Sequence, residues 1–123
     1  MTKLFQDLER FDSEDVRAAL ARDDPKELQF VSITLALSSP DAVFAQDICL
    51  RLCAHENRTV RANAIMSLGH IARRFRMLDE RMVKPVIEAA LRDPDDQVRM
   101  LAKSSADEVH QFLHWDIAGH VYG

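Results

Sequence analysis

Two stretches of the chain share one pattern: N-R-T-V-R-A-N-A-I-M-S-L-G-H-I-A-R-R-F at Asn57–Phe75 and D-D-Q-V-R-M-L-A-K-S-S-A-D-E-V-H-Q-F-L at Asp95–Leu113. A shift of 38 residues superimposes the two copies. The matched apolar positions are Val60 and Val98, Ala64 and Ala102, Leu68 and Ala106, Ile71 and Val109, and Phe75 and Leu113. A fixed period of this length, with helical spacing inside each unit, is the sequence signature of an α-solenoid.

The same shift aligns the segments that precede the two copies, where Ile48 falls on Val86. Each unit is therefore predicted to be a pair of helices. The predicted ranges are about 40–56 with 57–75, and 78–93 with 95–114. Asp79 is the predicted N-cap of the first helix in the second pair. Pro85 is predicted to bend that helix, because its ring removes an interior backbone donor.

Two further helix starts are readable upstream of the repeats. Asp24 and Pro25, followed by Glu27, have the spacing of a capping box and predict a helix. Ser39 is the predicted cap of the next helix, which begins at Pro40.

The two ends of the chain are predicted to cap the solenoid. Residues 3–22 predict either one broken helix or two short helices, with Asp12 or Ser13 as the N-cap between two apolar stripes. Gly119 is the predicted helix stop near the other end. The tail residues expected to fold back over the last helix pair are Trp115, Ile117, Val121 and Tyr122.

These features resemble the HEAT-repeat family, whose second helices open with D-x-x-V-R-x-x-A after an Asp-Pro turn. The residues that carry the resemblance, over about residues 24–114, are Asp93-Pro94-Asp95, Val98-Arg99 and Ala102, then Asn57, Val60-Arg61, Ala64, Leu68-Gly69 and Ile71, and the in-helix Pro85. The resemblance implies an all-α, right-handed solenoid of about two and a half helix pairs, with the second helices on the concave side. It also implies that Arg61 and Arg99 are structural, with Asp93 or Asp95 as partners.

Composition and charge narrow the class of protein. A chain of 123 residues with 47% hydrophobic and 29% charged residues is expected to form one domain, divided into an N-terminal cap (1–23), the repeats (24–114) and a C-terminal tail (115–123). No apolar run approaches the ~20 residues of a membrane span, and the start lacks an apolar signal core, so a cytoplasmic location is expected. The net charge of −4 divides into −5 over residues 1–56 and +1 over residues 57–123. An acidic half opposes a nucleic-acid groove and favours a basic partner.

Few residues suggest a catalytic, redox or metal-binding role. Cys49 and Cys53 lie on an apolar helical face and are expected to be buried and reduced, with a metal or redox role as the alternative. His110 and His114 have the i, i+4 spacing of a metal-binding pair but lack a third ligand of matching spacing, which favours surface or partner contact. The sequence contains no nucleophile–base set and no phosphate-binding loop. We therefore predict no enzyme, no metal and no cofactor.

Arg73, Arg74 and Arg76 form a basic cluster. They follow the helix that ends at Phe75, where cations suit the helix dipole. Contact with nucleic acid is the alternative interpretation of this cluster.

The face of residues 57–75 opposite the core is predicted to be a binding surface. A shift of 32 residues aligns Leu28 with Val60 and so places Thr34 beside Met66. The predicted strip across the second helices consists of Phe30, Thr34, Asn63, Met66, His70, Met100 and Ser104. Asp23, Asp24 and Glu27 form its acidic end and are expected to meet basic side chains. The alternative is that the terminal segments cover this strip.

A small, acidic solenoid is best suited to binding a single protein partner. In this respect the chain resembles the small HEAT-like immunity proteins of bacteria, which neutralise a cognate toxin such as a contact-dependent growth inhibition nuclease. Nuclease toxins are basic because they hold phosphates, so an acidic partner would steer association. The alternatives are a HEAT adaptor or scaffold with another protein partner, and a nucleic-acid-binding HEAT domain similar to the HEAT-type DNA glycosylases. A small-molecule ligand is not expected.

Overall fold

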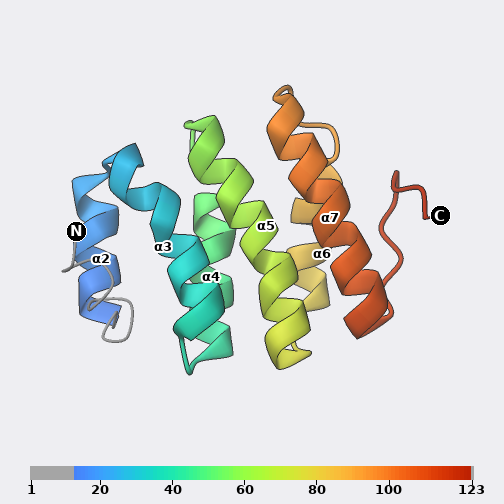
Figure 1. The fold of residues 1–123 in the computed structure, drawn as a ribbon, viewed down its shortest axis with the longest axis horizontal. Helices are drawn as coiled ribbons and strands as arrows, with labels where there is room; N and C mark the ends of the chain where they lie inside the picture. Colours follow the sequence, from blue (N-terminus) through green and yellow to red (C-terminus); the bar gives the residue numbers. More distant parts are fainter. Residues whose placement is uncertain (1–12, 123) are drawn as a thin grey trace.

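The computed structural model describes residues 13–122, which form a short α-solenoid without β-strands (Figure 1). Its helices are α2 (Ser13–Arg22), α3 (Pro25–Ser38), α4 (Ala42–Leu52), α5 (Arg58–Phe75), α6 (Glu80–Ala90) and α7 (Asp96–Leu113). Helices α3, α5 and α7 lie side by side in one layer, and α4 and α6 form a second layer behind them (Figure 1). The predicted all-α solenoid is confirmed.

Each helix from α3 to α7 begins at a capping side chain that accepts hydrogen bonds from the first free backbone N–H groups. The caps are Asp24, Asp41, Asn57, Asp79 and Asp95. The spacing from Asp41 to Asp79, and from Asn57 to Asp95, reproduces the period of 38 residues. The caps predicted at Asp24 and Asp79 are therefore confirmed.

Three details of the predicted helices are wrong. Asp41, and not Ser39, caps α4, because the Ser39 hydroxyl accepts a hydrogen bond from the Asp41 N–H in the preceding turn. Helix α4 is also shorter than predicted, at Ala42–Leu52. Glu27 does not complete a capping box, since both of its carboxylate oxygens accept hydrogen bonds from Arg22, at 2.9 and 2.6 Å.

The ends of the described chain match the prediction in part. Helix α2 begins at Ser13, and the predicted elements before it lie outside the described residues. Helix α7 stops at His114, which adopts a left-handed conformation with φ 61°, and not at Gly119, which lies in a later turn of the tail. Trp115 and Ile117 are buried as predicted, whereas Val121 is exposed.

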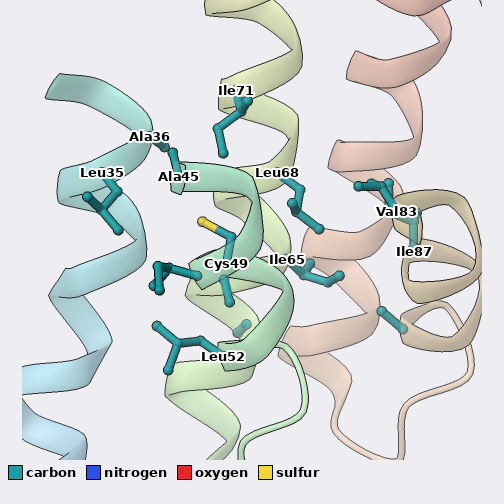
Figure 2. Packing of buried hydrophobic residues seen from close by; sticks show 14 of the residues in the cluster. Leu35, Ala36, Ala45, Cys49, Leu52, Ile65, Leu68, Ile71, Val83 and Ile87 are labelled. Atoms are coloured by element: carbon teal, nitrogen blue, oxygen red, sulfur yellow. The ribbon is translucent and has the colours of Figure 1, made fainter. Parts of the chain in front are cut away.

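Helix α5 is the centre of the core. It packs against α3, α4 and α7, and its buried residues Ile65 and Leu68 lie in the space between α4 and α6 (Figure 2). Gly69 allows α5 and α7 to approach closely, because a Cβ atom there would lie 3.2 Å from the Ser105 Cα atom. Small residues at this contact therefore let α5 and α7 pack closely.

Candidate protein-binding face

The α3–α5–α7 layer carries the predicted strip, but α3 lies in a different register from the predicted one. The buried and half-buried positions of residues 31–36 recur in the same order at residues 64–69, a shift of 33 residues. The caps Asp24 and Asn57 are separated by the same distance in sequence. The predicted shift of 32 residues is therefore wrong by one residue, which rotates the inferred face of α3 by about 100°.

This correction changes which residues of α3 are accessible. Thr34, predicted to lie on the strip, is 7% exposed and buried, like its repeat counterpart Ser67. Phe30 (46% exposed), Ile33 (half-buried) and Leu37 (58% exposed) form the accessible stripe of α3 instead. The accessible stripe of α3 is thus more apolar than predicted from the sequence.

The remaining residues of the strip lie in the α3–α5–α7 layer. Asn63, Met66 and His70 are half-buried on α5, and the Asn63 amide donates a hydrogen bond to the Gln29 carbonyl oxygen at 2.9 Å, which joins α5 to α3. Ser104 on α7 is exposed.

Met100 protrudes from α7 at one end of the layer. It is 62% exposed, whereas its repeat counterpart on α5, Ala62, is fully buried. No second helix follows α7 within residues 13–122, which explains the difference.

A polar cluster lies between α5 and α7 on this layer. Arg73 donates a hydrogen bond to Glu108 at 3.1 Å and lies 2.9 Å from the His70 Nδ1 atom. Since arginine only donates, Nδ1 accepts, and the neutral imidazole carries its proton on Nε2. Burial lowers the pKa of His70, and the neighbouring Arg73 cation lowers it further. His70 is thus a neutral donor at neutral pH.

The three acidic residues predicted at the end of the strip have partners within the chain. Asp23 lies 2.7 Å from His55 Nε2, Asp24 caps α3, and Glu27 pairs with Arg22. The hydrogen bonds from Arg22 hold the pKa of Glu27 below its ordinary value. These carboxylates remain accessible, but part of their charge is already compensated.

The repeated arginines have structural roles, as the resemblance implied, and Arg61 joins two successive repeats. Arg61 forms a two-pronged ion pair with Asp93 at 3.0 and 3.1 Å and also donates to the His55 and Glu56 carbonyl oxygens. Arg99 makes the equivalent bond to the Asp93 carbonyl oxygen. Its carboxylate partner is Asp96, however, and not the predicted Asp93 or Asp95.

The basic cluster at the end of α5 is also used within the fold. Arg74 donates to the Ala36 carbonyl oxygen at 3.2 Å, and its guanidinium lies over the Phe75 ring. Arg76 lies over the Phe112 ring. These contacts give the arginines structural roles that require no nucleic acid.

The candidate metal or redox residues form no such site in the described part of the chain. Cys49 is buried, Cys53 is half-buried, and both are free thiols. Burial raises the pKa of Cys53 to about 12, so this thiol is a poor nucleophile at neutral pH. His110 lies 3.0 Å from the Trp115 carbonyl oxygen, and residues 13–122 contain no group of three side chains placed to hold a metal ion.

None of the described helices combines the length and the apolar character that crossing a membrane requires.

Comparison with known proteins agrees with the architecture. A family model for HEAT repeats matches residues 2–106. Neither the curated proteins nor the solved structures gave a significant match to the chain. The family match includes α2–α6 and the first turns of α7, and therefore most of the helical layers described above. The chain belongs to the HEAT-repeat family.

Proposed function

We propose that this protein binds one protein partner through the α3–α5–α7 face and has no catalytic role. The observation that carries the proposal is the apolar stripe on α3, where Phe30 and Leu37 are exposed and Ile33 between them is half-buried. Exposed apolar side chains grouped on one face mark interaction surfaces. Met66 and His70 extend this surface onto the neighbouring helix α5.

The proposed face combines an apolar centre with polar edges. Phe30 and Leu37 are the anchors, because each exposes roughly half of a large apolar side chain. Asn63, His70 and Ser104 supply hydrogen-bonding groups beside them. Interfaces of this composition derive most of their affinity from central apolar anchors, while charges at the edge set the association rate.

The proposed partner is a basic toxin domain, and the protein would act as its immunity protein. This finer proposal rests on the acidic balance of residues 1–56 and on the accessible carboxylates of Asp23 and Asp24 at one end of the face. An acidic surface accelerates the encounter with a basic partner. A HEAT adaptor for a partner of another charge remains the competing function, and the salt dependence of binding separates the two.

The experiment is capture from the native host followed by measurement with the purified partner. Phe30→Asp, Leu37→Asp, Met66→Arg and His70→Glu are each expected to weaken binding by about tenfold or more. Val43→Glu, on the α4–α6 layer, is the matched control and is expected to bind like the wild type. Unchanged affinity in all four face variants would contradict the proposed binding face.

The character of the partner tests the finer proposal. The immunity function predicts a basic partner that stops bacterial growth when it is expressed alone, and growth that recovers on co-expression with this protein. Affinity is expected to fall as salt is raised. A partner that is neither basic nor toxic would establish the adaptor function, and strengthening of nucleic-acid binding at low salt in a shift assay would establish the nucleic-acid alternative.

A further inference from the structure

A second apolar surface lies on the other layer of the solenoid, along α4 and α6. Val43 and Met82, in the first turns of these helices, are 59% and 53% exposed. Leu50 follows Val43 at a spacing of seven residues on α4, and Ala89 follows Met82 at the same spacing on α6. Helical periodicity therefore places one apolar stripe along each helix.

The two stripes border a hollow at the final turns of α4 and α6. The hollow has a volume of about 320 Å³ and is lined by Leu50, Ala54 and Ala89, among others, with Ile65 of α5 below them. Figure 2 shows Ile65 in the space between α4 and α6. The small side chains Ala54 and Ala89 leave this end open, whereas Val43 and Met82 protrude at the other end.

Charge is also distributed unevenly along this layer. Asp41 is the N-cap of α4, Asp47 lies at the middle of the helix, and Arg51 lies in its last turn. All three side chains are exposed, and within residues 13–122 none of them takes part in an ion pair. On α6, Glu80 forms an ion pair with Lys84 at 3.1 Å, and Arg81 beside it is exposed.

We propose that a second copy of this chain docks on the α4–α6 layer to form a two-fold symmetric dimer. The two-fold axis runs across the helices, so that α4 of one copy lies antiparallel to α4 of the other. Val43 of each copy then approaches Ala54 of its partner, and Asp47 approaches Arg51. Each contact occurs twice in such an interface, because one surface meets its own copy.

Two properties of the surface favour this occupant. The protruding end is complementary in shape to the hollow end, and antiparallel packing brings the two together. Asp47 at the middle of α4 likewise meets Arg51 at the end of the same helix in the other copy, which favours the antiparallel direction of packing. Parallel packing would instead place Asp41 and Asp47 near the same residues of the other copy and would leave both hollows empty.

Sedimentation velocity over about a hundredfold range of concentration tests the proposal, and a concentration-dependent dimer is expected. Val43→Glu combined with Met82→Glu is expected to weaken the dimer by about a hundredfold, because carboxylates would enter an apolar contact. Both positions are exposed, so circular dichroism is expected to show an unchanged fold. Phe30→Asp, on the other layer, is the control and is expected to dimerise normally.

Charge reversal tests the antiparallel direction. Asp47→Arg and Arg51→Asp are each expected to weaken the dimer by about tenfold, and the double variant is expected to restore it. A wild-type protein that stays monomeric throughout, or a dimer that tolerates the Val43 and Met82 changes, would overturn the proposal. Failure of the double variant to recover would overturn the antiparallel arrangement. Because the partner-binding variants lie on the other layer, these results are independent of the proposed function.

Discussion

Arg61→Met removes the polar connection between two successive repeats. The change eliminates two hydrogen bonds to the Asp93 carboxylate, at 3.0 and 3.1 Å, and two to the carbonyl oxygens of His55 and Glu56, at 3.1 and 2.8 Å. The Arg61 and Asp93 side chains are only 18% and 13% exposed, so the variant leaves a carboxylate largely removed from water. Breaking a buried pair in this way costs roughly 3–5 kcal/mol.

We expect the lower end of that range, about 3 kcal/mol, because both side chains retain some contact with water. For a chain of this length, that loss corresponds to a fall in Tm of about 10 °C. Urea unfolding followed by circular dichroism at 222 nm measures the free energy of unfolding, provided that the m-value is unchanged. Asp93→Asn in the Arg61→Met background is expected to recover part of the loss, since it removes the unpaired charge.

Arg99→Met is the matched control, because Arg99 occupies the same place in the next repeat. Arg99 donates to the Asp93 carbonyl oxygen and to Asp96, whose side chain is fully accessible, but it reaches no carboxylate of a following repeat in the described chain. Its removal is expected to cost about 1 kcal/mol. Equal losses for the two arginine variants would refute the idea that the inter-repeat ion pair is the source of the stability.

The same ion pair predicts how stability depends on pH. Burial would raise the pKa of Asp93, but hydrogen bonds from Arg61 and from the Asp95 N–H outweigh it, so the pKa lies below the ordinary value. A lowered native pKa contributes stability that is present above the unfolded pKa of about 3.9 and is lost as the pH falls through the native value. The difference in unfolding free energy between wild type and Arg61→Met is therefore expected to be smaller at about pH 3 than at pH 7. A difference that does not change with pH would contradict this account.

Three other substitutions test the packing. Gly69→Ala is expected to destabilise the fold by about 1–2 kcal/mol in urea titrations, because the new methyl group would lie 3.2 Å from the Ser105 Cα atom. This cost is expected to exceed the gain from the better helix propensity of alanine. A gain in stability would show that α7 can shift to make room for the methyl group. Pro85→Ala is expected to be tolerated, with an unchanged or higher Tm, because the proline is exposed and removes a donor inside α6. Ala64→Asp is expected to abolish the helical circular dichroism signal, because it places a charge at a fully buried position, and a cooperative native-like transition would contradict that expectation.

The architecture was predictable because it follows from local signals that recur. The polar caps Asn57 and Asp95 open the two second helices, and the apolar positions after them are separated by the same number of residues. The partner of Arg61 was also predictable, since the family resemblance implied an acidic residue in a neighbouring turn and Asp93 provides it. The caps and the apolar periodicity depend on residues that are close in sequence, whereas the Arg61–Asp93 pair joins residues 32 apart and was implied by the family pattern.

The face of α3 was predicted less well, for a physical reason. Leu28 and Val60 are both buried, so a shift of 32 residues aligns them, but the caps and the rest of α3 follow a shift of 33. An apolar helical stripe is wide enough to tolerate a slip of one residue, and the slip exchanges Thr34 for Ile33 on the surface. Tertiary contacts, such as the bond from Asn63 to the Gln29 carbonyl oxygen, decide the register.

The exposed apolar residues of the α4–α6 surface could not be predicted from the repeat, because they do not occupy equivalent positions in the two repeats. The shift of 38 residues pairs Val43 with Arg81 and Met82 with Phe44. Phe44 is half-buried and packs against the core, whereas Met82 is exposed. The two layers therefore acquire different surfaces from one repeated pattern, and the two proposed interfaces do not overlap.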